Sequence, residues 1–267
     1  MPSITVPPDP LYGSGPSGVE ALAISTRRSW LDRLLHTLLP APCLGCGDPL
    51  PARASLSLCT PCRGKLSPIP RVACAVCAAA LNAFEPPSGF RCGACREHPP
   101  AFDRLLALWA YGAPLDAVIQ GLKFRRLDYL GRHLAEALSD GLGEALAGFD
   151  AVVPVPLHWR RRLARGYNQA EQIGKPLARL LGLPLLPALR RSRSTPPQTS
   201  LGKAERLANL RRAFWTPHPR RLHQLRLLLV DDVATTGATL DAAAAALRRA
   251  GASGVTAVVA ARTPAVR

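Results

Sequence analysis

Two adjacent carboxylates, Asp231 and Asp232, are the residues whose type and spacing most directly indicate chemistry. They follow the apolar run Leu227–Val230, which lacks in/out alternation and so predicts a strand covered on both faces of a parallel sheet. The next stretch, 234–239, combines small residues, one glycine and three threonines, which suits a loop that binds an anion. Carboxylates accept hydrogen bonds from hydroxyls and help to hold hydrated Mg²⁺, but they repel phosphate. The order of strand, acid pair and small-residue loop predicts a ligand with a diol at the acids and a phosphate at the loop, as in a ribose 5-phosphate. The alternative is that the two acids form an acidic turn on the surface.

The segment after this loop, 240–250, is rich in alanine and predicts a helix that ends at Gly251. No lysine lies between Val230 and Leu247, which argues against a nucleotide P-loop. The whole stretch closely resembles the 5-phosphoribosyl-1-pyrophosphate (PRPP) motif of type I phosphoribosyltransferases. Besides the two acids, the residues expected to bind PRPP here are Val233, Ala234, Thr235, Thr236, Gly237, Ala238 and Thr239.

A second predicted strand, Phe149–Leu157, ends in two prolines and is followed by an arginine-rich stretch. Pro154 and Pro156 restrict the backbone where the sheet ends. Ligands bind at the carboxyl ends of parallel strands, so we expect this stretch at the same edge as the acid pair. Forked guanidinium groups there would bind a leaving pyrophosphate, and amides would act as neutral donors; the alternative is a solvated basic loop. The residues concerned are Val155, Pro156, Arg160, Arg161, Arg162, Arg165, Asn168 and Gln169.

Three further segments complete the predicted α/β domain: a strand at 105–111, helical periodicity over 115–138, and a last strand at 255–261 that closes the sheet. Lys123 lies in the helical segment. On its own it is an exposed helix cation. The phosphoribosyltransferase resemblance implies instead that it faces pyrophosphate or substrate, and with Asp231, Asp232 and Arg165 it forms the expected catalytic set.

The segment 190–209 is polar, basic and interrupted by two prolines. Long segments of this kind inside a compact domain are usually disordered or act as lids. PRPP hydrolyses easily and its transfer passes through a cationic ribosyl centre, so a closing lid would exclude water. The residues expected to act from this segment are Arg190, Arg193, Gln198 and Arg206.

Eight cysteines form four CxxC pairs. The first two pairs are separated by twelve residues and the last two by fourteen, which predicts two zinc ribbons in tandem, each with a closed structural site. Consecutive pairing gives one set of Cys43, Cys46, Cys59 and Cys62 and another of Cys74, Cys77, Cys92 and Cys95. Interleaved pairing, and one or two bound zinc ions, are open at this point.

The chain has 267 residues and a formal net charge of +16, carried almost entirely by arginine. This charge favours polyanions such as nucleic acid, an anionic membrane or a phosphorylated substrate, although arginine enrichment also follows from a GC-rich genome.

The N-terminus lacks a secretory signal, and no apolar run has the length of a membrane span. We therefore expect a cytoplasmic protein in which cysteines bind metal, not disulfide partners. A basic amphipathic helix predicted before Pro40 docks on the protein itself or, as the alternative, on the inner membrane surface or a partner.

The order of six segments, LKFRRL, VVPVPL, ARGYNQAE, TPPQTSL, RLANLRRAF and VDDVATTGAT, behind CxxC pairs resembles the ComF competence family. The resemblance implies a type I phosphoribosyltransferase fold behind a zinc-ribbon module, and a setting in the uptake of transforming DNA. It implies an enzyme that uses Mg²⁺ and PRPP, with an acceptor that the sequence does not specify. The alternative is a non-catalytic protein that binds single-stranded DNA, or docks on a competence helicase or membrane DNA-uptake channel, with PRPP as regulator or relic. The expected divisions are a disordered tail (1–26), the amphipathic helix (27–40), a double zinc ribbon (41–100) and the transferase domain (101–267).

Overall fold

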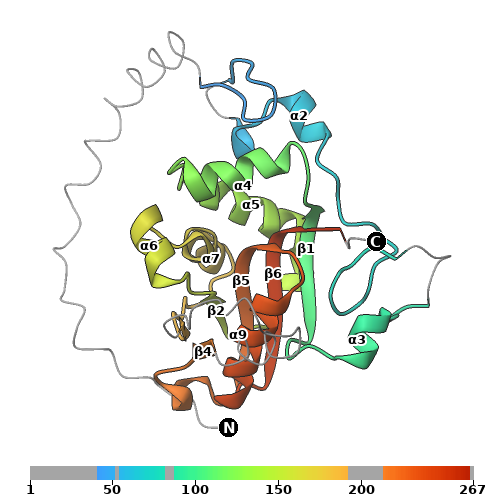
Figure 1. Cartoon of the computed structure of the whole chain (residues 1–267), viewed down its shortest axis with the longest axis vertical. Helices are drawn as coiled ribbons and strands as arrows, with labels where there is room; N and C mark the ends of the chain where they lie inside the picture. Colours follow the sequence, from blue (N-terminus) through green and yellow to red (C-terminus); the bar gives the residue numbers. More distant parts are fainter. Residues whose placement is uncertain (1–40, 52–53, 82–86, 192–212, 265–267) are drawn as a thin grey trace, which may run out of the picture. The chain divides into compact units, whose positions relative to one another are not determined.

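A parallel β-sheet forms the centre of the computed structural model, which describes residues 41–51, 54–81, 87–191 and 213–264 (Figure 1). Among these residues the sheet has four strands in the order β1-β6-β5-β2. All neighbouring pairs are parallel. The strands are β1 (Arg104–Ala110), β2 (Ala151–Pro154), β5 (Arg226–Ala234) and β6 (Gly254–Arg262).

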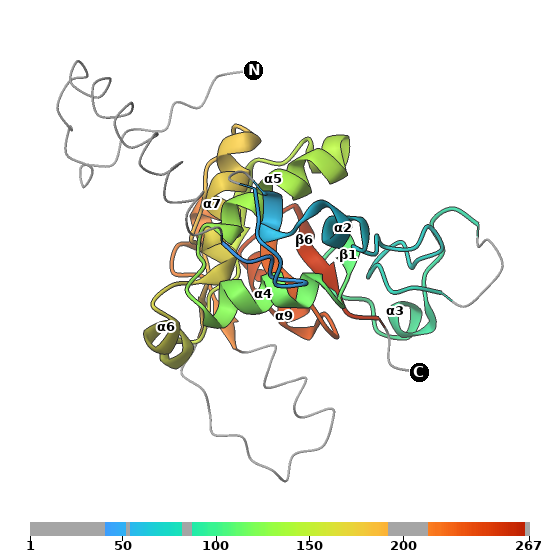
Figure 2. The same cartoon turned by 90° about the horizontal axis from the view of Figure 1, so that it is seen from above.

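Helices cover both faces of this sheet, as the unbroken apolar runs of β5 and β6 predict. Leu228, Val230 and Val258 pack with α4 (Leu115–Phe124), α5 (Leu130–Leu142) and α7 (Gln169–Leu180). Leu227 and Leu229 pack on the opposite side with α9 (Ala238–Arg249). Figure 2 shows α5 and α7 on one side of the strands and α9 on the other. The remaining elements are α2 (Thr60–Gly64), α3 (Gly93–Glu97), α6 (Trp159–Arg165), the 3₁₀ turns η1 (Ser55–Ser57), η2 (Gly143–Leu146) and η3 (Pro219–Leu222), and the antiparallel pair β3 (Arg190–Arg191) and β4 (Phe214–Trp215).

The cysteine-rich segment contacts the helices and the sheet at several places. In its first half, the amide of Leu56 donates to Nδ1 of His133 in α5 at 3.2 Å. Between its two halves the chain runs along β1, with Pro68 bridged antiparallel to Trp109. The amide of Ala110 donates to the carbonyl of Ser67 at 2.8 Å in the same place. From Pro42 onward the described residues fall in one compact unit.

Several expected boundaries differ from the structure. The helical segment 115–138 is two helices, because the chain turns between α4 and α5 with a left-handed residue at Arg126 (φ 55°). The last strand, β6, lies inside the sheet between β1 and β5, so it does not close the sheet at an edge. Leu185, in the segment between α7 and β3, forms an isolated parallel bridge with Val152 of β2.

Three sequence predictions fall on residues outside the described ranges: the disordered tail, the amphipathic helix, and the lid residues Arg193, Gln198 and Arg206. The division of the chain at residue 100 stays a prediction. Within the part of the chain that the structure describes, no helix has the length and apolar character needed to cross a bilayer.

The α5–α7 contact depends on Gly131. A Cβ placed on this residue would lie 2.4 Å from the backbone oxygen of Gln172 in α7. We therefore expect Gly131→Ala to lower the free energy of unfolding by about 1–3 kcal/mol, because the helix backbones must move apart. Denaturant unfolding measures this. Gly64→Ala is the control, since nothing lies within 4 Å of its added methyl, and equal stability of the two variants would contradict the prediction.

Candidate functional site

Asp231 and Asp232 lie within the carboxyl-terminal part of β5, not after it as predicted. The strand continues to Ala234 because β6 pairs beside it as far as Arg262. Asp232 is only 6% exposed, and its Oδ2 lies 3.0 Å from Nζ of Lys123 in α4. Oδ1 of Asp231 accepts a hydrogen bond from the amide of Asp232 at 2.9 Å. The two acids and the lysine that the sequence singled out therefore meet at one edge of the sheet.

The surroundings of the Asp231 carboxyl disfavour its ionised form. Burial and the neighbouring Asp232 raise its pKa to about 7, against the opposing effect of Lys123 and Arg191. Removal from water and a like charge both disfavour the ionised form. A cationic ligand or a donor of hydrogen bonds at this position would return the carboxyl to its ionised state.

The loop after β5 is short and leads directly into a helix. It comprises Thr235, Thr236 and Gly237, because α9 already begins at Ala238. Gly237 has φ 82°, a left-handed conformation that suits glycine. Both threonines are exposed, and the Thr236 hydroxyl accepts from the amide of Ala238 at 3.3 Å. Free amides and hydroxyls at the start of a twelve-residue helix provide donors for an anion.

The end of β2 supplies the facing wall of the site. The amide of Val155 donates to the carbonyl of Val230 at 2.9 Å, which joins the two strand ends. Asn168 donates to the carbonyl of Val155 at 3.0 Å and caps α7 by accepting from the amide of Ala170. Its amide group therefore positions this loop, and its predicted contact with the ligand stays a prediction.

Arg165, at the end of α6, connects three elements. Its guanidinium lies 4.8 Å from the ring centroid of Phe124 in α4, and it donates to Oε1 of Gln169 at 3.0 Å. Burial and the nearby Arg161 lower the pKa of Arg165, while Asp232 opposes the shift. The Nε2 of Gln169 is buried without a hydrogen-bond partner among the described residues. A buried donor of this kind is costly unless a ligand or water accepts from it.

In the segment after α7, the basic residue that interacts with the acid pair is Arg191, which was not among the predicted site residues. Its positive charge acts on Asp231, and burial and Arg161 lower its pKa. Its guanidinium lies over the ring of Phe214, at 5.3 Å from the centroid. The predicted Arg190 is exposed and donates to the carbonyls of Pro187 and Leu189. Successive residues of a strand point in opposite directions, and this alternation is the signal that separates the two arginines.

The eight cysteines form two clusters with the consecutive pairing, one of Cys43, Cys46, Cys59 and Cys62 and the other of Cys74, Cys77, Cys92 and Cys95. Within each cluster the sulfur atoms lie within 4.8 Å of one another, which fits a tetrathiolate zinc site.

Backbone amides prepare one thiolate in each cluster. Burial alone would raise the pKa of Cys43, but amide donors from Cys59, Cys46 and Gly45 lower it to about 6. The pKa of Cys74 falls to about 7 for the same reason, with the Cys92 amide as the leading donor. Deprotonated thiols are the form that binds zinc, so both clusters are suited to a structural zinc ion.

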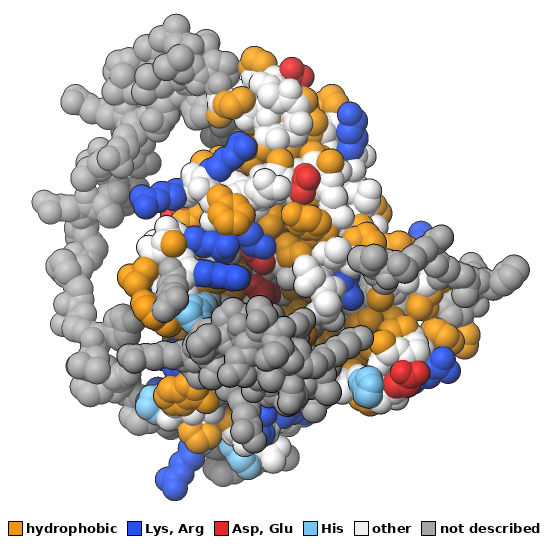
Figure 3. Space-filling view, in the orientation of Figure 1, with side chains coloured by type: hydrophobic (Ala, Val, Ile, Leu, Met, Phe, Trp, Pro, Cys, Tyr) orange, Lys and Arg blue, Asp and Glu red, His pale blue; other side chains and the backbone are white. Residues whose placement is uncertain are grey.

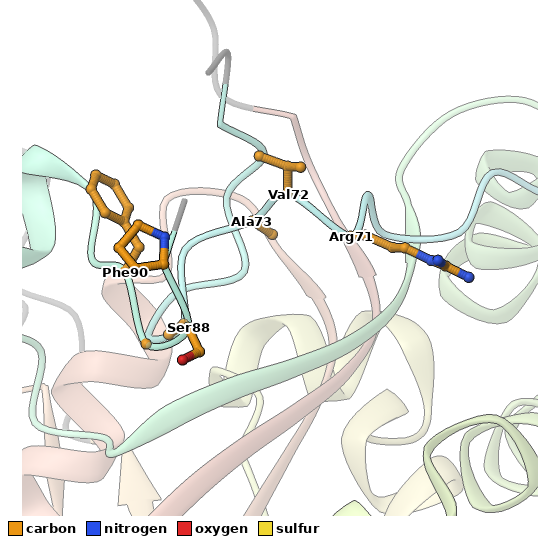
Figure 4. A pocket seen from close by; sticks show the side chains of 8 residues that line it. Arg71, Val72, Ala73, Ser88 and Phe90 are labelled. Atoms are coloured by element: carbon orange, nitrogen blue, oxygen red, sulfur yellow. The ribbon is translucent and has the colours of Figure 1, made fainter. Parts of the chain in front are cut away.

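A small cavity of about 290 Å³ lies in the second ribbon, between 71–75 and 87–90 (Figure 4). Its wall contains Val72, Ala73 and Phe90, and the Arg71 side chain points away from Phe90. None of the strand-end residues contributes to it.

Known proteins match both parts of the chain. The double zinc ribbon domain family model matches residues 34–97, and the phosphoribosyl transferase domain model matches residues 168–267. Competence protein F of Haemophilus influenzae is 32% identical over 205 residues, which span 74% of this chain and 87% of the relative. This chain belongs to the competence protein F family. DNA utilization protein YhgH of Salmonella typhi is 34% identical over 214 residues, spanning 74% and 93% of the two chains.

One solved structure, the glutamine phosphoribosylpyrophosphate amidotransferase from B. subtilis, is 21% identical to this chain. The alignment covers 50% of this chain and 26% of the amidotransferase chain, with a TM-score of 0.35. The chain combines a double zinc ribbon with a type I phosphoribosyltransferase-like domain of parallel sheet and helices.

The raised pKa of Asp231 predicts a pH-dependent cost to folding. In the unfolded chain the group ionises near its ordinary value of 3.8, whereas in the folded chain it ionises at about 7. The folded state therefore loses stability as the pH rises between these values, and the full loss is present above pH 7. We expect Asp231→Asn to raise Tm at pH 8 by about 3–6 °C, equivalent to roughly 1–2 kcal/mol, and by about half as much at pH 5.5.

Differential scanning calorimetry at both pH values measures this effect. Asp140→Asn is the matched control, because Asp140 is an exposed carboxylate of α5. If Asp231→Asn melted no higher than the wild type at pH 8, the acid pair would carry no such cost.

Proposed function

We propose that this competence protein F relative is a phosphoribosyltransferase that binds PRPP with Mg²⁺ at the carboxyl edge of its sheet. The observation that carries the proposal is the acid pair of β5 followed at once by the threonine and glycine loop and the start of α9. Carboxylates that accept from hydroxyls, next to amides that donate to an anion, match a ribose with a 5-phosphate.

The proposed subsites follow the chemistry of each group. Asp231 and Asp232 accept hydrogen bonds from the two ribose hydroxyls, and the residues 233–239 surround the 5-phosphate. Arg165, Gln169 and the Val155–Pro156 backbone bind pyrophosphate from the facing wall. The unpartnered Nε2 of Gln169 supports this assignment, since pyrophosphate oxygen would satisfy it.

Lys123 and Arg191 bring positive charge to the acid pair. Lys123 is paired with Asp232 at 3.0 Å, so a ligand that uses this carboxylate must share it with the lysine. We propose that the Lys123 ammonium then turns to the pyrophosphate, for which a cation is the preferred partner. Mg²⁺, held mainly by PRPP oxygens and water near the acids, would supply further charge neutralisation when bound.

In the proposed reaction the bond between C1 of the ribose and the pyrophosphate oxygen breaks, and pyrophosphate leaves with the electron pair. A nucleophile with a free electron pair forms the new bond to C1 and then releases its proton. The side chains of the site position the reactants and stabilise the leaving charge, and no covalent intermediate with the protein is required.

We expect isothermal titration calorimetry to detect PRPP binding in the presence of Mg²⁺, and Asp231→Ala to weaken it at least about tenfold through the loss of hydrogen bonds to a charged group. Asp140→Ala is the control, because it removes an equally negative side chain from the exposed part of α5. Pyrophosphate release, measured with candidate acceptors and with single-stranded DNA, then tests turnover. Absence of binding, or equal binding by Asp231→Ala, would exclude the proposed site.

A second proposed function is the binding of single-stranded DNA on the face that holds the site. Phe124 is 69% exposed, and α6 presents Trp159 and Leu163 at 47% and 75% exposure. Exposed Arg161 and Arg162 lie in the same helix. Hydrophobic side chains and Lys and Arg side chains adjoin one another on this face around acidic groups (Figure 3). Exposed aromatics among cations are typical of surfaces on which bases stack and phosphates bind.

The names of the relatives, a competence protein and a DNA utilization protein, support a role for this chain in the uptake of DNA. The formal charge of +16 supports contact with a polyanion. We propose a cytoplasmic protein that acts at the inner face of the membrane, where a competence helicase or a DNA-uptake channel would deliver the strand.

Fluorescence anisotropy with a labelled oligothymidylate tests this second function. We expect affinity to fall steeply between about 50 and 200 mM salt, as counterions compete for the phosphates. Phe124→Ala should weaken binding by about tenfold, the loss of one stacked base. Trp215→Ala is the control, since Trp215 is 50% exposed on β4. Salt-independent affinity, or equal losses in both variants, would contradict the proposal.

A further inference from the structure

The last residue of β6, Arg262, is a buried cation that joins two distant parts of the chain. It is 8% exposed. Its Nε donates to the carbonyl of Cys77, a member of the second cysteine cluster, at 3.1 Å. Its Nη1 donates to the carbonyls of Ala234 at 3.2 Å, of Thr263 at 2.9 Å, and also of Thr235. One guanidinium thus connects the second zinc ribbon to the loop after β5.

Arg262 holds the carbonyl of Ala234, the last residue of β5, which also accepts from the amide of Thr263 at 2.9 Å, and the carbonyl of Thr235, the first residue of the loop. In a planar trans peptide the C=O and the following N–H are antiparallel. Fixing the carbonyls of Ala234 and Thr235 towards Arg262 therefore directs the N–H groups of Thr235 and Thr236 away from it. Both threonines are exposed, so this part of the loop is accessible to a ligand from solvent.

The charge of Arg262 needs compensation because it is buried. Within the described ranges no carboxylate lies within ion-pair distance of it, and its acceptors are neutral carbonyls. Four thiolates around one Zn²⁺ carry a net negative charge. A filled second cluster, whose ligand residue Cys77 is in contact with Arg262, would provide the missing counter-charge.

Packing reinforces this connection. Cys74, Phe102 and Leu240 belong to the same buried cluster, so the second ribbon and the first turns of α9 share a core. The amide of Ala101, just after the ribbon, donates to Oδ1 of Asp241 at 2.7 Å. The first ribbon has no such link to the loop among these contacts; it is bonded to α5 through His133.

We propose that Arg262 is a positioning residue through which zinc in the second cluster sets the shape of the anion-binding loop. Without zinc there, Arg262 loses its counter-charge and the Cys77 carbonyl is no longer held in place, so the loop amides lose their common direction. Zinc in the first cluster does not have this effect. The proposal rests on the proposed function only in naming the 5-phosphate of PRPP as the anion.

Two substitutions of Arg262 test the proposal, and they differ in which properties of the arginine side chain they retain. Arg262→Met keeps the length of the side chain and removes its charge and donors. Arg262→Lys keeps the charge but loses the fork that reaches several carbonyls at once. Arg226→Met is the matched control, because Arg226 is an exposed arginine at the opposite end of the neighbouring strand β5.

Two measurements on the zinc-loaded full chain detect the coupling without any ligand. Hydrogen exchange followed by mass spectrometry reports on the peptide that contains 232–239. Thiol alkylation during a chelator challenge, mapped by peptide, reports which cluster releases zinc first. In Arg262→Met we expect loop exchange about tenfold faster and earlier alkylation of Cys74 and Cys77, with Cys43 and Cys46 unchanged. Arg262→Lys should show a smaller shift in the same direction, and Arg226→Met none.

In the wild type, zinc loss confined to the second cluster should speed exchange of the loop. The proposal would be overturned if the hydrogen exchange rate of the loop were unchanged both in the wild type without zinc in the second cluster and in Arg262→Met. If Arg262→Met does not fold, an Arg262→Lys variant with wild-type exchange and alkylation overturns it equally. PRPP affinity, expected to fall about tenfold in Arg262→Met, is a separate measurement. A wild type that does not bind PRPP refutes the proposed function, while exchange and alkylation still decide the coupling.

Discussion

Two carboxylates lie next to each other on a buried strand, and the surrounding structure compensates their negative charge. Asp231 and Asp232 repel one another, and the sheet that holds them excludes much of the water that would screen them. Cations from separate parts of the chain offset this negative charge: Lys123 from α4, Arg191 from β3 and, at greater range, Arg165 from α6. The arrangement is strained electrostatically and pre-organised chemically, as is typical of sites where a ligand completes the balance.

The cysteine-rich segment takes part in this arrangement from two directions. Its first half packs on the helices that carry Lys123: a Cβ on Gly45 would lie 3.0 Å from Pro114, and Leu44 lies close to Gly121 of α4. Its second half reaches the loop after β5 through Arg262. The helix that carries Lys123 and the end of β5 are therefore each in contact with one half of the cysteine-rich segment, which gives a physical reason for the zinc ribbons and the transferase-like domain to occur in one chain.

Much of this could be predicted from local pattern. Unbroken apolar runs indicated buried parallel strands, and the spacing of the CxxC pairs indicated two four-cysteine clusters, whose consecutive pairing is confirmed. The residues that escaped prediction act through contacts across the fold. Arg191 was missed in favour of Arg190 because the direction of a two-residue strand is set by its pairing with β4. Arg262 and Phe124 lie in ordinary strand and helix sequence, and only their three-dimensional neighbours make them significant.

The short segment that joins the two ribbons has a consequence for solubility. By pairing with β1 at Pro68 and Trp109, it covers what would otherwise be an open edge of the sheet. Open edges present unpaired amides and carbonyls that other chains can extend into aggregates. Since this segment lies between the two four-cysteine clusters, zinc bound in them would protect the sheet from intermolecular strand addition. Metal depletion would then leave the β1 edge of the sheet open to pairing with strands of other chains, independently of any ligand.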